Sequence, residues 1–184
     1  IFMPDYAFKI AIRLRLGLPL SDNLPFSCPH CDYPLTADPA HILACTKAVG
    51  LNKSKRHDVI RDLLTSFLHR AGIRAVTEAL YYSSAMPVPD IDATFPSYDT
   101  ELVDVCVSTP TCGSYVEYGQ NRLGAANFHE NRKKRDYDDE VKRLDMSFTP
   151  FILETFGAIA DKASTFIDKI VYHAVDAAPS IFSS

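Results

Sequence analysis

The sequence lacks an apolar segment that could cross a membrane, since a bilayer-spanning helix needs about 20 consecutive apolar residues and charges interrupt every apolar stretch sooner. No secretory signal peptide is expected from the given sequence, because Lys9, Arg13 and Arg15 break up the apolar N-terminal stretch. No internal repeat or low-complexity tract is present. Basic residues are not in excess: 19 Lys and Arg against 23 Asp and Glu give a net charge of −4, which is weak support for nucleic-acid binding.

The five cysteines do not form the even set that a disulfide framework needs. One CxxC pair is followed by a His-x-x-x-Cys, which favours a metal site in a reducing compartment. We therefore expect an intracellular protein, nuclear or cytoplasmic, with no membrane partner. The chain begins at Ile1 rather than at a methionine, and we expect it to be part of a longer protein.

The hydrophobic pattern predicts an α/β (α+β) fold with a small mixed sheet flanked by helices. We expect two parts: residues 1–50 with a helix and a zinc knuckle, and residues 51–184 as the larger domain. The final helix should turn Ile159, Ala163, Ile167, Ile170 and Ala174 inward. The predicted elements are a helix over 5–17, a helical turn after residue 39, a helix over 53–72, strands over 73–78, 91–95 and 102–108, helical structure over 115–144, a strand over 148–156 and a final helix after residue 157.

The knuckle has the spacing Cys28-x2-Cys31-x9-His41-x3-Cys45. A tight turn brings the sulfurs of a CxxC pair to one ion, and residues i and i+4 of a helical turn face the same way. Four protein ligands close a tetrahedral shell, so the predicted Zn²⁺ is structural. His30, inside the CxxC, is the alternative histidine ligand.

Acidic residues occupy the polar faces of two predicted strands. Asp104 alternates with valines, so it lies opposite an apolar face and would need a metal or a partner if buried. Asp90 and Asp92 are two residues apart and therefore share one face of their strand.

Several stretches together resemble a known family, the restriction-enzyme-like PD-(D/E)xK endonuclease domain with a CCHC knuckle at the C-terminus of site-specific non-LTR retrotransposon reverse transcriptases. The resemblance covers nearly the whole chain, and its motifs are weak singly and more specific in their order. The matching stretches are 13–20 (RLRLGLPL), the knuckle, 56–62 (RHDVIRD), 89–96 (PDIDATFP), 103–110 (VDVCVSTP), 133–137 and 151–157 (FILETFG).

The resemblance implies a metal-dependent nuclease in which acidic residues hold Mg²⁺ or Mn²⁺ and the metal activates a water. Asp104 takes the second acidic position, and we favour Asp92 over Asp90 for the first. Cys106 stands where an acid-x-Lys motif would have its lysine, so the lysine is expected from the following helix, as Lys133 rather than Lys134. Glu78 could add a carboxylate.

The expected partners are DNA, with RNA as a further candidate, and other domains of a longer polyprotein. Nucleic-acid contacts are expected from Arg56, His57, Arg61 and Lys134, with His57 at a helix start that favours anions. The resemblance implies that the function is to nick target DNA so that the new 3′ hydroxyl primes reverse transcription. The alternatives are a catalytically inactive nuclease fold that binds nucleic acid or protein, and a structural zinc protein. No role follows from the sequence for Glu154.

Overall fold

The computed structural model describes residues 3–19, 27–45, 47–48, 53–79, 82, 87–112, 115 and 117–177. It is a mixed α/β structure, as predicted. Its elements are α1 (Asp5–Arg15), α2 (His41–Ala44), α3 (Lys53–Arg70), β1 (Arg74–Thr77), β2 (Ile91–Thr94), β3 (Thr100–Ser108), the 3₁₀ turn η1 (Tyr118–Gln120), α4 (Gly124–Arg143), β4 (Ser147–Glu154) and α5 (Asp161–Ala177).

The four strands form one mixed sheet in the order β1-β2-β3-β4. The pairs β1–β2 and β2–β3 are antiparallel, and β3–β4 is parallel. β2 begins at Ile91, opposite Val103, whereas β3 continues to Ser108. The last residues of β3 therefore extend beyond the end of β2, and this part of the strand is where the acidic residues gather.

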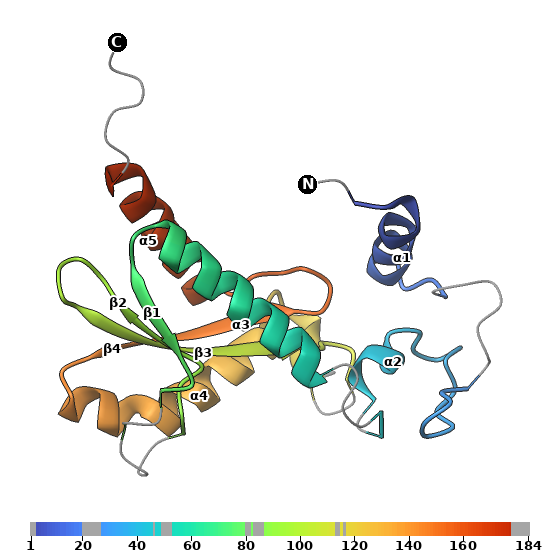
Figure 1. Cartoon of the computed structure of the whole chain (residues 1–184). Coiled ribbons are helices and arrows are strands. Elements are labelled where there is room, and N and C mark those ends of the chain that lie inside the picture. The colour runs from blue at the N-terminus through green and yellow to red at the C-terminus, as the bar shows by residue number, and fades with distance from the viewer. Residues whose placement is uncertain are drawn as a thin grey trace.

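Helices cover both faces of the sheet (Figure 1). Leu64 and Leu68 of α3 and Phe166 of α5 pack with Val103 and Val105 in the main core. On the other face, Tyr137 of α4 packs with buried residues such as Leu102. Alternation along β3 thus separates an apolar valine face from a face that carries Leu102 and Asp104, as the period of a strand requires.

Two details of the predicted elements are wrong. The structure begins the long helix at Gly124 instead of residue 115, because the η1 turn packs so closely that a Cβ at Gly124 would lie 1.7 Å from the Tyr118 carbonyl oxygen. In the last helix, Ala163 and Ile170 are buried and Ile167 packs against the core, but Ile159 precedes the helix and is exposed, and Ala174 is exposed. The last turns of α5 run past the sheet (Figure 1).

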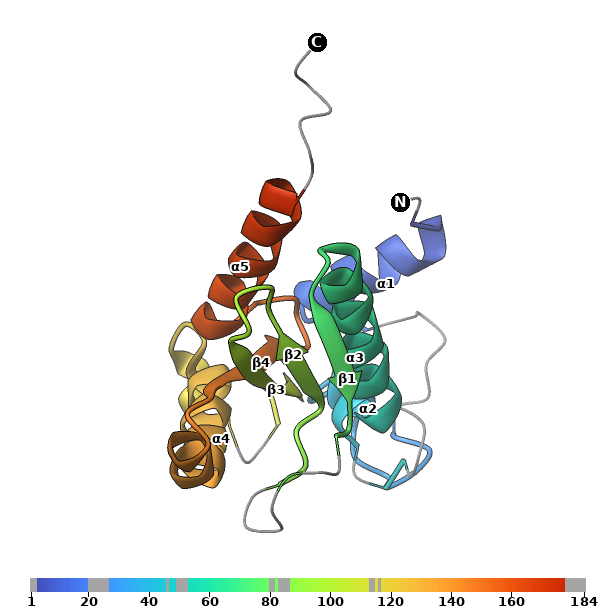
Figure 2. The ribbon, with the colours of Figure 1, turned by 60° about the vertical axis from the view of Figure 1, so that its left-hand side comes forward.

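The knuckle lies beside the first turns of α3 (Figure 2). The Arg56 guanidinium of α3 donates a hydrogen bond to the Leu43 carbonyl oxygen of α2, which ties the two parts together. The predicted boundary between the two parts, at residues 50 and 51, lies outside the described residues. Within the part of the chain that the structure describes, no helix is long and apolar enough to span a membrane.

Candidate metal centre and carboxylate cleft

A hairpin turn forms the first half of the knuckle. The Cys28 N–H donates to the Tyr33 carbonyl and the Asp32 N–H to the Cys28 carbonyl, while Asp32 takes a left-handed φ of 58° to close the turn. The second half is the short helix α2. Asp38 accepts a hydrogen bond from the Ala40 N–H just before α2 begins, so local side-chain chemistry fixes the start of this helical turn.

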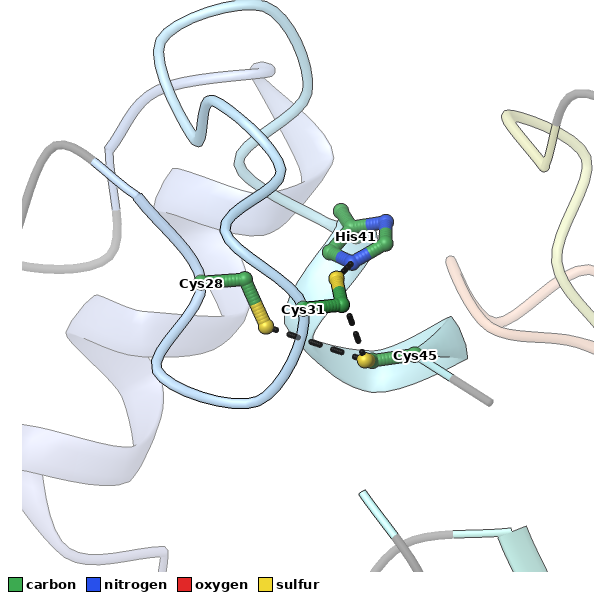
Figure 3. A group of neighbouring side chains, drawn as sticks. All are labelled: Cys28, Cys31, His41 and Cys45. Atoms are coloured by element: carbon green, nitrogen blue, oxygen red, sulfur yellow. Dashed lines mark hydrogen bonds between the residues drawn. The ribbon is translucent and has the colours of Figure 1, made fainter. Parts of the chain in front are cut away.

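Four side chains of the knuckle converge, as Figure 3 shows. Their ligand atoms all lie within 4.8 Å of one another. Sγ of Cys45 is 3.7 Å from that of Cys28 and 3.6 Å from that of Cys31, and Cys31 Sγ is 3.0 Å from Nε2 of His41. Two Zn–S bonds of about 2.3 Å at a tetrahedral angle hold their sulfurs about 3.8 Å apart, and a disulfide needs about 2.05 Å. The cluster fits a tetrahedral Zn²⁺, with His41 rather than His30 as its nitrogen ligand.

The thiols of the knuckle have the chemistry of metal ligands. Burial raises the pKa of the Cys45 thiol, but the backbone N–H groups of Lys47 and Ala48 and the neighbouring sulfurs outweigh it and lower that pKa to about 6. The Tyr33 N–H favours the Cys31 thiolate, yet burial and the neighbouring sulfurs raise the Cys31 pKa. The neighbouring sulfurs thus favour the thiolate of Cys45 and disfavour that of Cys31. A bound cation would stabilise both thiolates, since a metal binds the deprotonated form.

A second polar cluster lies at the end of β3. Lys133 of α4 forms an ion pair with Asp104, and both side chains are mostly buried. Asp90, just before β2, accepts hydrogen bonds from the Val105 N–H at 2.6 Å and from His57 Nε2 at 2.9 Å. The Asp90 and Asp104 carboxyl groups are close enough to shift each other's pKa. Four segments of the chain thus supply one site.

The electrostatics of this cluster are those of two crowded acids. Burial, followed by the neighbouring Asp90 carboxyl, raises the pKa of Asp104 to about 7 despite the nearby Lys133. Burial also acts on Asp90, but His57 and its other hydrogen bonds outweigh it and lower its pKa. The hydrogen bond between His57 and Asp90 raises the pKa of His57 to about 8. Two adjacent carboxyl groups of this kind favour a cation between them.

The cluster opens into a cleft of about 490 Å³ between α3 and α4. Its lining includes Asp104 and Lys133, with His57 on one side and His129 and Arg132 on the other. Asp104 forms an acidic floor, and the walls carry basic side chains together with the acidic Asp58 and Asp136. A cation bound by the carboxylates would attract a phosphate group, and the basic side chains of the cleft would stabilise the negative charge of the phosphate.

Asp92 lies elsewhere on the same sheet face. It pairs in register with Leu102, and its buried carboxylate accepts a hydrogen bond of 2.5 Å from the Tyr82 hydroxyl. Continuing this antiparallel register by two residues brings Asp90 alongside Asp104. The acidic neighbour of Asp104 is therefore Asp90, and not Asp92 as the sequence pattern favoured.

Glu78 and Arg61 pair with each other. The Arg61 guanidinium contacts Glu78 as well as Asp58 and Asp62 on its own helix. The backbone of Glu78 is in the left-handed conformation, and 64% of the Glu78 side chain is exposed. Glu78 does not line the cleft that Asp104 lines. The structure thus places both predicted site residues in a surface ion-pair network.

The other predicted nucleic-acid contacts have distinct surroundings. Arg56 reaches the Leu43 carbonyl, and burial lowers its pKa. Lys134 forms a helical ion pair of 2.5 Å with Glu130. His57 alone of these residues lines the cleft, where it contacts Asp90.

Glu154 has a structural explanation that the sequence did not provide. Its Oε1 accepts a hydrogen bond of 3.3 Å from the Ala126 N–H in the first turn of α4. The first N–H groups of a helix have no partners within it, and a carboxylate there is favourable. Glu154 on β4 thus helps to anchor the helix that carries Lys133.

The fold and its two clusters define a mixed α/β protein with a Cys₃His cluster that could hold a metal ion and a cleft with a carboxylate–lysine pair. The chain is similar to the "Retrotransposable element SLACS 132 kDa protein" of Trypanosoma brucei gambiense, with 26% identity over 181 residues. The match covers 92% of this chain and 14% of that protein. The chain therefore spans about one seventh of the length of this distant relative. No family model matches the chain.

Proposed function

We propose that the chain is a metal-dependent endonuclease domain of a retrotransposon polyprotein, built on the PD-(D/E)xK plan and cutting DNA. The observation that carries the proposal is the ion pair of Asp104 and Lys133 in the cleft, with the Asp90 carboxylate beside it on the cleft residues His57 and Val105. The similarity to a retrotransposable-element protein gives this chemistry a context. A domain that nicks chromosomal target DNA would act in the nucleus, where other parts of the polyprotein would extend the nick by reverse transcription.

Asp90 and Asp104 would hold Mg²⁺ or Mn²⁺. Mg²⁺ commonly uses one or two protein carboxylates and keeps several waters, so two acids suffice. Such an ion supplies a water of lowered pKa and neutralises charge on the scissile phosphate. His57 and the Val105 N–H hold Asp90 by hydrogen bonds, and this second layer keeps the carboxylate ionised and oriented.

Lys133 would stabilise negative charge that develops on the phosphate, or position the attacking water. It reaches the cleft from the middle of α4, on the helix face that also buries Tyr137. This explains how Cys106 can replace the lysine of an acid-x-Lys motif. When an ion binds the carboxylates, the ammonium group is free to turn from Asp104 to the phosphate.

The zinc in the knuckle would be structural. All four ligands come from the protein, which leaves no open position for a reacting water. The knuckle has only a small buried cluster around Cys28, Leu35 and Cys45, so the metal would supply most of its stability. Arg56 would transmit the position of the knuckle to the first turn of α3, where His57 lies.

Nicking of supercoiled plasmid by the purified chain in Mg²⁺ or Mn²⁺ tests the proposal. Two matched pairs sharpen the test: Asp90→Asn against Asp92→Asn, and Lys133→Ala against Lys134→Ala. We expect at least a hundredfold loss of nicking from the first member of each pair and less than threefold from the second. Equal losses within a pair, or nicking that survives Asp104→Ala, would refute this site.

The second candidate is a nucleic-acid-binding or protein-binding module that keeps the fold without catalysis. Two observations favour it: the cysteine at position 106 and the net charge of −4. In this case an electrophoretic shift of DNA or RNA would appear without cleavage in either metal, and Asp90→Asn would leave the shift unchanged.

A further inference from the structure

Four aromatic side chains gather at the start of α4, and we refer to them as the aromatic group: Tyr115, Tyr118, Phe128 and His129. The rings of Tyr118 and Phe128 lie 4.9 Å apart, Tyr115 lies 5.4 Å from Phe128, and Tyr115 lies 4.8 Å from His129. The group forms a continuous set of ring contacts outside the hydrophobic core clusters of the described residues.

The aromatic group continues directly into the cleft. His129 belongs to both, since it touches Tyr115 and lines the cleft beside Arg132 and Lys133. On α4, Phe128 precedes Arg132 by four residues and His129 precedes Lys133 by four, so each ring stands one turn, about 5.4 Å, from a cation on the same helix face. The rings therefore stand next to cations on α4, and on this side the cleft is lined by His129, Arg132, Lys133 and Asp136.

The backbone holds these rings in a preformed arrangement. A Cβ at Gly124 would lie 1.7 Å from the Tyr118 carbonyl oxygen, and one at Gly119 would lie 2.9 Å from the Pro110 carbonyl oxygen. Leu123 adopts a left-handed φ of 57° to allow this close approach. The main chain at Tyr118 thus packs closely on the start of α4, while Tyr118 as a residue stays 43% exposed.

We propose that the aromatic group binds an unpaired base of a single-stranded nucleic acid whose backbone lies along Arg132 and Lys133. A ring next to a cation serves this ligand well, because the base stacks on the ring while the cation attracts the phosphate. Tyr118 offers the most exposed ring, and His129 links it to the acidic floor. The proposal deepens the nuclease function and rests on it for the neighbouring scissile phosphate: the preferred substrate would have unpaired nucleotides beside the cut.

Fluorescence anisotropy of a labelled oligothymidine strand, titrated with the full chain in EDTA, tests binding without cleavage. A stacked base contributes about 1–3 kcal/mol, so Tyr118→Ala should weaken binding about tenfold, whereas Tyr118→Phe should retain it. Tyr172→Ala is the matched control, since Tyr172 is an exposed tyrosine of α5, and should have no effect. A duplex of equal length should bind more weakly than the single strand.

An abasic strand of the same length separates stacking from charge. It should bind the wild type about tenfold more weakly than oligothymidine, and Tyr118→Ala should not weaken it further. Equal effects of Tyr118→Ala on both strands would overturn the proposal, and so would the absence of any binding to oligothymidine. Asp104→Ala should abolish nicking but keep the base-dependent binding, so failure of the nuclease function and failure of this binding site give different results.

Discussion

Replacing Asp104 by asparagine should make the metal-free protein more stable, although it removes a proposed catalytic ligand. Burial and the adjacent Asp90 raise the pKa of Asp104 to about 7 from an ordinary 3.8. Each pH unit between these values corresponds to about 1.4 kcal/mol, so at pH 8 the ionised carboxylate costs the folded state up to about 4 kcal/mol. The nearby Lys133 is already included in this raised pKa, so we expect Asp104→Asn to stabilise the metal-free protein at pH 8 by up to about 4 kcal/mol.

The sign of the pH dependence follows from the direction of this shift. Well below the ordinary pKa of 3.8 the Asp104 carboxyl is protonated in both the folded and the unfolded chain, so wild type and Asp104→Asn should have the same stability. Between pH 4 and pH 7 the folded wild type binds more protons than the unfolded chain, and its stability falls relative to the variant. Above pH 7 the difference should remain constant.

Urea unfolding in EDTA at pH 5 and pH 8 measures the effect as a change in midpoint at constant m-value. The gain should be at least twice as large at pH 8, and Mg²⁺ should stabilise the wild type but not the variant. Asp138→Asn is the control: this carboxylate is exposed beside Lys142, and its removal should change stability by less than about 0.5 kcal/mol. A variant less stable than wild type at pH 8, or a gain independent of pH, would refute the reasoning.

Three further predictions concern the knuckle and the core. Cys31→Ser should weaken the thiolate charge-transfer absorption that Co²⁺ gives when it replaces Zn²⁺ in the wild type, because only two of the three thiolates remain. An unchanged spectrum would exclude Cys31 as a ligand. Arg56→Ala removes the hydrogen bond between α3 and the Leu43 carbonyl of α2. It should therefore increase amide hydrogen exchange in α2 around Leu43 without lowering the urea midpoint of the sheet. Exchange equal to that of the wild type would show that other contacts hold the knuckle. On α3, Leu68→Ala should lower the free energy of unfolding in urea by about 2–5 kcal/mol, since Leu68 is fully buried. Leu63→Ala should lower it by less than about 1 kcal/mol, since Leu63 is 49% exposed. Similar losses from the two variants would contradict the assigned helix face.

Local patterns gave correct predictions for most of the fold. The spacing of apolar residues placed α3 and α5, and alternation along β3 identified Asp104 on the polar face. The knuckle is equally local, because all its ligands lie between Cys28 and Cys45 and a turn and a short helix suffice to bring them together. The face of α4 that carries Lys133 was also predictable, since it repeats every three to four residues with the buried Ala126 and Tyr137.

Helical composition before Gly124 misled the prediction for a physical reason. Residues 115–123 contain good helix formers, but the Tyr118 backbone approaches α4 more closely than any side chain at position 124 would permit. Helix propensity is worth less than 1 kcal/mol per residue for ordinary residues, and tertiary packing overrides it. The break in the helix is also what assembles the aromatic group.

The choice of acidic partner was beyond the sequence. Asp90 and Asp92 have the same strand parity, and both sit in a short acidic stretch, so no local rule separates them. The register between β2 and β3 decides between them, because it sets Asp92 opposite Leu102 and leaves Asp90 beside Asp104. Such a register arises from the packing of whole strands.

By itself the sequence determined what short-range chemistry fixes: a Cys₃His knuckle, the main helices and strands, and an aspartate facing away from the valines of its strand. The tertiary structure alone decided which charges meet. It joined Asp104 to Asp90 and Lys133, and it paired Arg61 with Glu78 on the surface. Side chains distant in the sequence become neighbours only when sheet register and helix docking bring them together, and these depend on the burial of the core as a whole.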